Sequence, residues 1–129
     1  MKISSQEFKD KVASDLKIDD LGKENLTNHA KQLFYLQLLI ESRFYLHKLE
    51  KLKDAVYQKL YHHYKFEFNH ELRGAEIEIY IRANEEYKKI NQPIREKEAE
   101  IDYLEEIVKM FQNRNFSIKN AIDLQKLEK

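Results

Sequence analysis

Glycine and proline, the residues that most often end helices and strands, are almost absent from this sequence. The chain has two Gly and one Pro among 129 residues. Because these residues punctuate turns, a chain so poor in them is expected to form long uninterrupted elements. Charged residues make up 36% of the chain, against about 25% in an average domain. Long helices with charged, solvated faces are typical of this combination, and we predict an all-α fold.

The length and the missing residue types narrow the class of protein. A chain of 129 residues is the size of one domain, so we predict a single helical domain over residues 1–129. With no Cys, a disulfide scaffold, a thiolate zinc site and a thiol nucleophile are excluded. The first residues lack the apolar core of a signal peptide, and no stretch reaches the roughly 18 apolar residues of a membrane span. We therefore expect a soluble, cytosolic protein.

The first part of the chain, residues 1–66, predicts a short helix followed by a long one. The capping box Ser4-x-x-Glu7 predicts a helix start, and the helix is expected to run to about Leu16. A turn is expected over 18–22, and the long helix from Asn25 or Thr27 to about Lys65. Its second half carries a nearly heptad stripe, made of Tyr45, Leu49, Leu52, Val56, Leu60 and His63.

A connector over 67–83 precedes the second long helix, expected within 84–129. In the connector, residues 75–82 alternate apolar and polar, which favours a strand, but no pairing partner is evident, so strand and helix both remain open. Pro93 marks a helix start or a kink. Asn113–Asn115 predicts a stop, and Ser117 would cap a final short helix. The heptad positions are Ile90, Ile94, Lys97, Ile101, Leu104, Val108 and Phe111. We expect the two long helices to form a coiled-coil-like hairpin that assembles into a homo-oligomer.

The net charge is zero, but the charges are unevenly placed. Residues 46–65 carry five Lys against one Glu and one Asp, and residues 109–129 also have an excess of three positive charges. Tyrosines lie among the lysines of the first block. Lysines that follow phosphates and rings that stack on bases are how single-stranded nucleic acid is bound, although lysines on a helix are also an ordinary solvated face. The candidate contacts in this block are Lys53, Tyr57, Lys59 and Lys65.

The residue patterns of familiar catalytic and metal sites are missing. Two separated glycines exclude the glycine-rich loops that hold phosphates. His63 and Glu67 are four residues apart, as metal ligands can be, but a site needs two or three more ligands. The carboxylates of residues 95–108 are typical of the solvated face of a coiled coil. We predict that the chain is not an enzyme and uses no cofactor or metal.

The C-terminal part of the sequence matches a known signature. Tyr103-Leu104-Glu105, followed by Arg114-Asn-Phe-Ser-Ile-Lys-Asn-Ala-Ile-Asp123, resembles the closing signature of the UvsY-type recombination mediators of T4-like bacteriophages. Upstream, Ile18-Asp19 with Leu21, and the segment 60–64, are similar to the corresponding parts of that family.

The resemblance implies a function, partners and a place of action. Members of the family are non-enzymatic mediators that bind single-stranded DNA coated by the phage single-strand binding protein. They weaken that coat and load a RecA-like phage recombinase, in the cytoplasm of the infected bacterial host. They act as ring-like homo-oligomers.

The resemblance also implies site residues. The family's basic tetrapeptide K-A-R-L aligns with 57–60, where Lys59 and Leu60 match and Tyr57 replaces a lysine. Arg114 and Lys119 match the C-terminal signature and are added to the DNA-binding candidates. The expected oligomer interface consists of Ile94, Ile101, Leu104, Val108, Phe111, Phe116, Ile118 and Ile122.

A rival hypothesis explains the same patterns without DNA. In this reading the chain is a helical scaffold or adaptor, whose heptads and acidic 95–108 segment bind partner proteins. Salt-sensitive DNA binding separates the two hypotheses, because a pure scaffold would show none.

Overall fold

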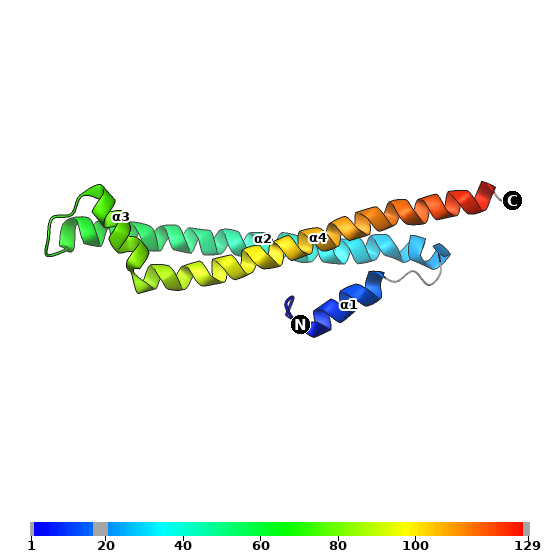
Figure 1. Ribbon diagram of the computed structural model, residues 1–129, viewed down its shortest axis with the longest axis horizontal. Coiled ribbons are helices and arrows are strands. Elements are labelled where there is room, and N and C mark those ends of the chain that lie inside the picture. Colours follow the sequence, from blue (N-terminus) through cyan, green and yellow to red (C-terminus); the bar gives the residue numbers. More distant parts are fainter. Residues whose placement is uncertain (1, 17–20, 128–129) are drawn as a thin grey trace. The chain divides into compact units, whose positions relative to one another are not determined.

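The computed structural model describes residues 2–16 and 21–127, and the regular secondary structure in that part of the chain is all helical (Figure 1). The all-α prediction is confirmed. The elements are α1 (Gln6–Leu16), α2 (Leu21–His62), a π-helical turn η1 (His63–Glu67), α3 (Gly74–Ala83) and α4 (Glu85–Leu127). None of the described helices is both long enough and apolar enough to span a membrane.

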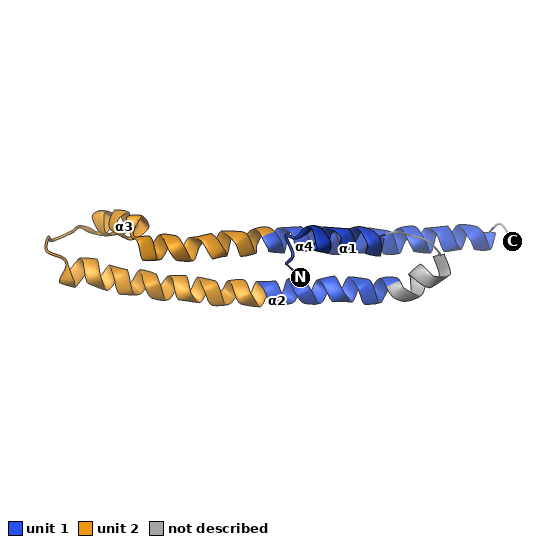
Figure 2. Ribbon diagram, turned by 90° about the horizontal axis from the view of Figure 1, so that it is seen from below, with its two compact units in different colours: residues 1–42, 100–129 blue, residues 43–99 orange. Residues whose placement is uncertain are grey.

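The contacts within the chain divide it into two compact units (Figure 2). Unit 1 contains residues 1–42 and 100–129, and unit 2 contains residues 43–99. Each of the two long helices contributes one segment to each unit. The expectation of a single domain stays a prediction, and the units are described separately below.

Unit 1 is built around three aromatic rings from three helices. Phe8 of α1, Tyr35 of α2 and Phe111 of α4 are all buried. The Tyr35 ring is stacked on the Phe111 ring, with 5.3 Å between ring centroids, and the Phe8 ring meets Tyr35 edge-on at 5.9 Å. Such pairs add about 1 kcal/mol each beyond their buried area. Val12, one turn after Phe8 on α1, is buried as well.

The start of α1 differs from the predicted cap by one residue. The Ser5 hydroxyl, rather than that of Ser4, accepts a hydrogen bond from the Phe8 amide at 3.2 Å. The Ser5 carbonyl accepts the first helical bond, from the Lys9 amide. Ser5 is thus the N-cap residue. Only Ser4 has a glutamate three residues on, as the capping box requires, but serine at either position can cap a helix.

The observed bounds of the first long helix also differ from the predicted ones. Residues 18–20 of the predicted turn lie outside the described part, while Leu21 and Gly22 already belong to α2. The long helix thus begins earlier than predicted. It ends at His62 and passes into η1, so the predicted end near Lys65 falls within the π-helical turn.

A polar cluster around Asp15 lies beside the rings of unit 1. The Tyr35 hydroxyl donates to the Asp15 carboxylate at 2.7 Å, and the Lys11 ammonium donates to it at 2.8 Å. Burial alone would raise the pKa of Asp15, but the hydrogen bonds from Lys11 and Tyr35 outweigh it and lower the pKa below the ordinary 3.8. Burial and the bond to Asp15 raise the pKa of Tyr35 far above its usual range. The pair therefore consists of a carboxylate and a neutral phenol at neutral pH.

This lowered pKa predicts acid-sensitive stability. A carboxylate that binds protons less readily when folded stabilises the fold above its unfolded pKa, and this contribution is lost as the pH falls through the folded pKa. Asp15→Asn should therefore lower the unfolding free energy near neutral pH, with the difference from wild type shrinking below about pH 4. Denaturant titrations over that pH range measure it, with exposed Asp10→Asn on the same helix as control. A difference that stays constant with pH would contradict the expectation.

Unit 2 has its own core, and that core decides the conformation of residues 75–82. Leu60, Tyr64, Ile77 and Ile81 form a buried cluster. Ile77 and Ile81 are four residues apart, so they share one face of α3. Ile79 completes the alternating pattern but is 66% exposed. The segment is therefore a helix, and the strand-like alternation comes from an isoleucine that faces solvent.

Asn84 alone separates α3 from α4. Its amide donates to the Ile81 carbonyl and so ends α3. Its side-chain oxygen accepts a hydrogen bond from the Glu86 amide at 2.9 Å, which starts α4. Its side-chain nitrogen donates to the Tyr64 hydroxyl at 3.1 Å. One asparagine therefore caps both helices and ties the turn to the core of unit 2.

The second long helix resolves one open alternative and contradicts one predicted boundary. α4 begins at Glu85, within the predicted range 84–129, so Pro93 lies inside the helix and does not mark its start. It continues through Asn113–Asn115 to Leu127, so the predicted stop and the separate final helix are wrong. Ser117 does not cap a helix, because its hydroxyl donates to the Asn113 carbonyl one turn earlier, at 3.2 Å. This back-bonding is common for serine inside helices.

Candidate nucleic-acid interface

The predicted DNA-binding lysines of α2 and η1 lie in unit 2 and do not share one helical face. Lys53 and Lys59 are six residues apart, which at about 100° per residue turns their side chains some 240° from each other. Both nevertheless reach the first turn of α4. The Lys53 ammonium lies over the Tyr87 ring, 5.5 Å from its centroid, and the Lys59 ammonium lies 3.3 Å from the Glu86 carboxylate. The structure thus brings these two lysines to α4.

Lys65 lies beside one exposed and one half-buried aromatic ring. Its ammonium is 5.4 Å from the centroid of the Phe66 ring and 5.6 Å from that of Tyr61. Phe66 is 67% exposed, so most of its ring is open to solvent. A cation beside an open ring is the arrangement that single-strand binding uses, since the ring stacks on a base while the cation meets a phosphate.

Tyr57 is placed differently from the stacking role expected of it. Its ring packs against the buried cluster of unit 2, with the Tyr61 ring 6.3 Å away and nearly parallel. Its hydroxyl donates to the Glu78 carboxylate, and this bond raises the pKa of Tyr57, with burial adding to the effect. Phe66 offers the more open ring.

The two C-terminal candidates lie in unit 1. Lys119 is exposed. Arg114 is 6% exposed, and its guanidinium donates to the Asp15 carbonyl and lies over the Phe111 ring, 5.9 Å from its centroid. An arginine held in this way is part of the packing of unit 1. The structure gives Arg114 this internal task instead of the exposed position that a phosphate contact requires.

Most of the residues predicted for an oligomer interface belong to the chain's own core. Of the eight, six are no more than 8% exposed in the single chain: Ile94, Ile101, Leu104, Val108, Phe111 and Ile118. These six side chains are thus already covered within the single chain. Phe116 is 67% exposed and Ile122 is half-buried. The heptad pattern is therefore confirmed as a sign of burial, while the assignment of these residues to an oligomer interface stays a prediction.

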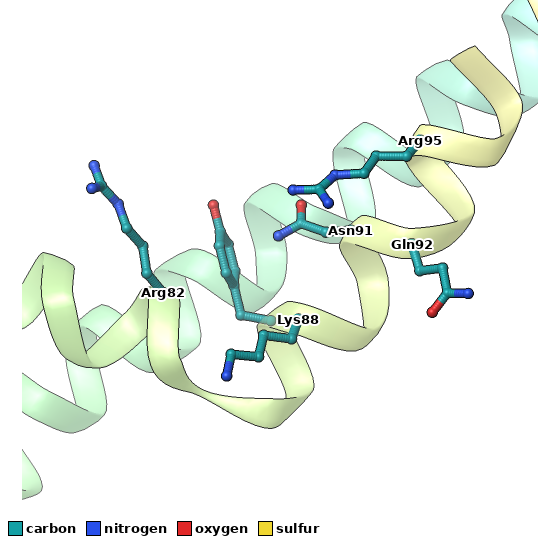
Figure 3. Close-up of a pocket in the computed structure, with 6 residues that line it drawn as sticks. Arg82, Lys88, Asn91, Gln92 and Arg95 are labelled. Carbon is teal, nitrogen blue, oxygen red and sulfur yellow. The ribbon is translucent and has the colours of Figure 1, made fainter. Parts of the chain in front are cut away.

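A polar pocket on unit 2 was not predicted. It has a volume of about 600 Å³ and is lined by Arg82, Tyr87, Lys88, Asn91, Gln92 and Arg95, and we call it the Arg82–Arg95 pocket. Arg82 belongs to the last turn of α3, and the other residues come from the first three turns of α4. Figure 3 shows the Arg95 side chain extending back along the helix toward Asn91. Three cations line the pocket, and no carboxylate does.

The pocket could not be predicted from the net charge of its segment. Residues 66–94 have four Lys and Arg against six Glu, so the segment reads as acidic. The glutamates lie at other helical positions, and the pocket is lined by three cations, two amides and the Tyr87 ring. An i, i+4 pattern over Tyr87, Asn91 and Arg95 was the available signal.

The His63–Glu67 pair does not form part of a metal site in the described residues. The His63 Nδ1 atom lies 3.3 Å from the Glu67 carboxylate, and His62 is 3.6 Å from the same group. Across residues 2–16 and 21–127, no group of three or more His, Asp or Glu side chains is arranged to hold a metal ion.

Comparison with known proteins gives both a family and a fold. A family model described as "Recombination, repair and ssDNA binding protein UvsY" matches residues 11–129. Crystal structures of the bacteriophage T4 recombination mediator protein UvsY have the same fold. The type IV lattice gives a TM-score of 0.82 at 17% identity, covering 100% of both chains. The type II lattice gives 0.82 at 15% identity, covering 99% of this chain and 98% of that one. No curated protein sequence matches the chain.

Proposed function

The chain belongs to the UvsY family, and on this premise we propose that it is a recombination mediator. In this proposal it binds single-stranded DNA, weakens or displaces the single-strand binding protein on that DNA, and loads a RecA-like recombinase. It acts by binding alone, without catalysing a reaction, in the cytoplasm of an infected bacterium. The match of the family model to residues 11–129 is the observation that carries the proposal.

The electrostatics of unit 2 support the DNA-binding part. Residues 43–99 have twelve Lys and Arg against ten Asp and Glu. Several cations are held only by exposed ion pairs, such as Lys59 with Glu86 at 3.3 Å. Exposed pairs of this kind contribute about 0–1 kcal/mol, so a phosphate can replace the carboxylate at little cost. Contacts to phosphates do not depend on base sequence, as a mediator that acts on any sequence requires.

We further propose that the protein works as a ring-like homo-oligomer. Several large apolar side chains of unit 1 face solvent in the single chain, and they offer an interface that the buried heptad residues do not. Leu33 is 64% exposed, Phe116 67% and Leu124 61%. Assembly would repeat the same weak DNA contacts in each copy, which raises overall affinity without any new contact.

Fluorescence anisotropy of a labelled single-stranded oligonucleotide tests DNA binding directly. We expect binding that favours the single strand over the duplex, rises cooperatively with protein concentration and weakens steeply with salt. The second step uses an oligonucleotide already coated with single-strand binding protein, to which a RecA-like recombinase is added. The mediator should shorten the delay before DNA-dependent ATP hydrolysis begins. If the protein binds no single-stranded DNA even at low salt, the mediator proposal is wrong, and the hypothesis of a helical scaffold or adaptor remains.

A further inference from the structure

We propose that the Arg82–Arg95 pocket binds backbone phosphates of single-stranded DNA. This inference rests on the proposed function and adds a site to it, formed by α3 and α4 next to Lys53 of the lysine block. The pocket's volume of about 600 Å³ falls within the range of pockets that hold small organic ligands. It is therefore large enough for a nucleotide unit of the strand.

The pocket concentrates positive charge. Its lining has three cations and no carboxylate, and a hollow lined by one sign of charge attracts the opposite sign. The nearest carboxylates pair with the cations only loosely. The Arg82 guanidinium is 4.0 Å from Glu78, and the Lys88 ammonium is 3.9 Å from Glu85. The cationic side chains of both pairs are more than half exposed, so these pairs open easily.

Two further groups in the pocket have donors to spare. Arg95 is exposed and has no ion-pair partner among residues 2–16 and 21–127. The half-buried side-chain amide of Asn91 has no hydrogen-bond partner in the same part of the chain. The Arg95 side chain is directed toward Asn91 (Figure 3). A guanidinium binds a phosphate through two parallel hydrogen bonds, and the neighbouring amide supplies a third donor.

The position of Tyr87 selects a nucleic acid as the ligand. Its ring lines the pocket and also lies under the Lys53 ammonium, at 5.5 Å. The pocket is therefore continuous with a lysine that the sequence pattern independently assigns to DNA. A strand that contacts Lys53 has its next phosphates within reach of the pocket.

The pocket is also held in shape. Arg82 comes from the end of α3 and Arg95 from α4, and the single residue Asn84 fixes the turn between these helices. Because Asn84 caps α4 and donates to Tyr64, the backbone positions that carry the cations of both helices are held in place. A preorganised set of donors loses less entropy on binding than flexible surface lysines do.

The test measures the salt dependence of oligothymidylate binding by anisotropy, for wild type and for Arg82→Gln/Arg95→Gln. Each phosphate contact removed should flatten the slope of log affinity against log salt by about 0.7. The double variant should therefore flatten it by about 1.4 and bind roughly tenfold more weakly at moderate salt. The control, Lys89→Gln/Lys109→Gln, removes the same charge from exposed positions of α4 outside the pocket and should keep the wild-type slope.

The outcomes separate this inference from the proposed function. If wild type binds the oligonucleotide and both double variants show the wild-type slope, the pocket assignment is overturned while the function stands. If wild type binds no single strand at all, the proposed function itself fails. Circular dichroism melts of each variant show that the fold is kept. Loss of oligoglutamate binding by the pocket variant, with DNA binding intact, would also overturn the assignment.

Discussion

Reversing the charge at Lys53, Lys59 and Lys65 together is expected to weaken single-stranded DNA binding by at least about a hundredfold at moderate salt. Each change to Glu removes a phosphate contact and adds a repulsive charge beside the strand. In an oligomer the effect is repeated in every copy, which lowers the avidity as well. Anisotropy titrations over a range of salt concentrations measure both the affinity and how many DNA phosphates the variant still neutralises.

The matched control for this variant changes the same net charge elsewhere. Lys2, Lys9 and Lys126 are exposed residues of unit 1, and their joint change to Glu should weaken binding far less. The new repulsion between residue 59 and Glu86 is checked by thermal melting, since these groups lie 3.3 Å apart as an ion pair in the wild type. Full affinity in the Lys53, Lys59 and Lys65 variant would remove these lysines from the site.

Phe111→Ala is expected to lower the unfolding free energy by about 3–5 kcal/mol, as for other buried aromatic residues. Phe111 is fully buried, stacks on Tyr35 and lies beneath the Arg114 guanidinium. Truncating it leaves a cavity beside Tyr35, in the cluster of rings where α1, α2 and α4 meet in unit 1. Denaturant unfolding followed by circular dichroism measures the decrease.

Phe116→Ala provides the control on the same helix. Phe116 is 67% exposed, so its truncation should cost less than about 1 kcal/mol in the single chain. If the homo-oligomer uses Phe116, the cost will rise with protein concentration, because binding of a second copy stabilises the folded state. Equal decreases for both variants at low concentration would contradict the burial described for unit 1.

The helical character of the chain was predictable because it depends on local properties. The scarcity of Gly and Pro and the spacing of buried residues such as Leu104 and Phe111 required no knowledge of distant contacts. The choice between strand and helix for residues 75–82 did require it. Ile77, Ile79 and Ile81 read as one strand face until the cluster around Leu60 shows which two are buried.

The errors at Asn113–Asn115 have the same physical origin. These residues resemble a helix stop because their polar side chains often bond to nearby backbone groups. In the structure they are used over long sequence distances instead. The Asn115 amide donates to Gln32 at 2.8 Å, and Arg114 donates to the Asp15 carbonyl. Because these side chains bond to partners elsewhere in the chain, they do not compete for the backbone groups of α4, and the helix continues.

The candidate site was only partly visible for a related reason. Charge counting along the sequence identified the lysines of residues 46–65, because they are adjacent in the chain. It passed over Arg82 and Arg95, which lie in segments with a net negative charge. Arg82 and Arg95 come together only through the turn between α3 and α4. That turn consists of Asn84, whereas a glycine or proline there would have predicted a turn from the sequence.

The single-residue link at Asn84 also limits how the length of this chain can vary. Residues 68–73 form the non-helical connection before α3, where an insertion adds loop without turning either neighbouring helix. Between α3 and α4 only Asn84 is outside a helix, so no loop can absorb an insertion there. One added residue there would rotate the following helix by about 100° about its axis, moving Tyr87 away from Lys53 and Arg95 away from Arg82. Related chains of different length are therefore expected to place their insertions in the loop and to keep a single residue between these two helices.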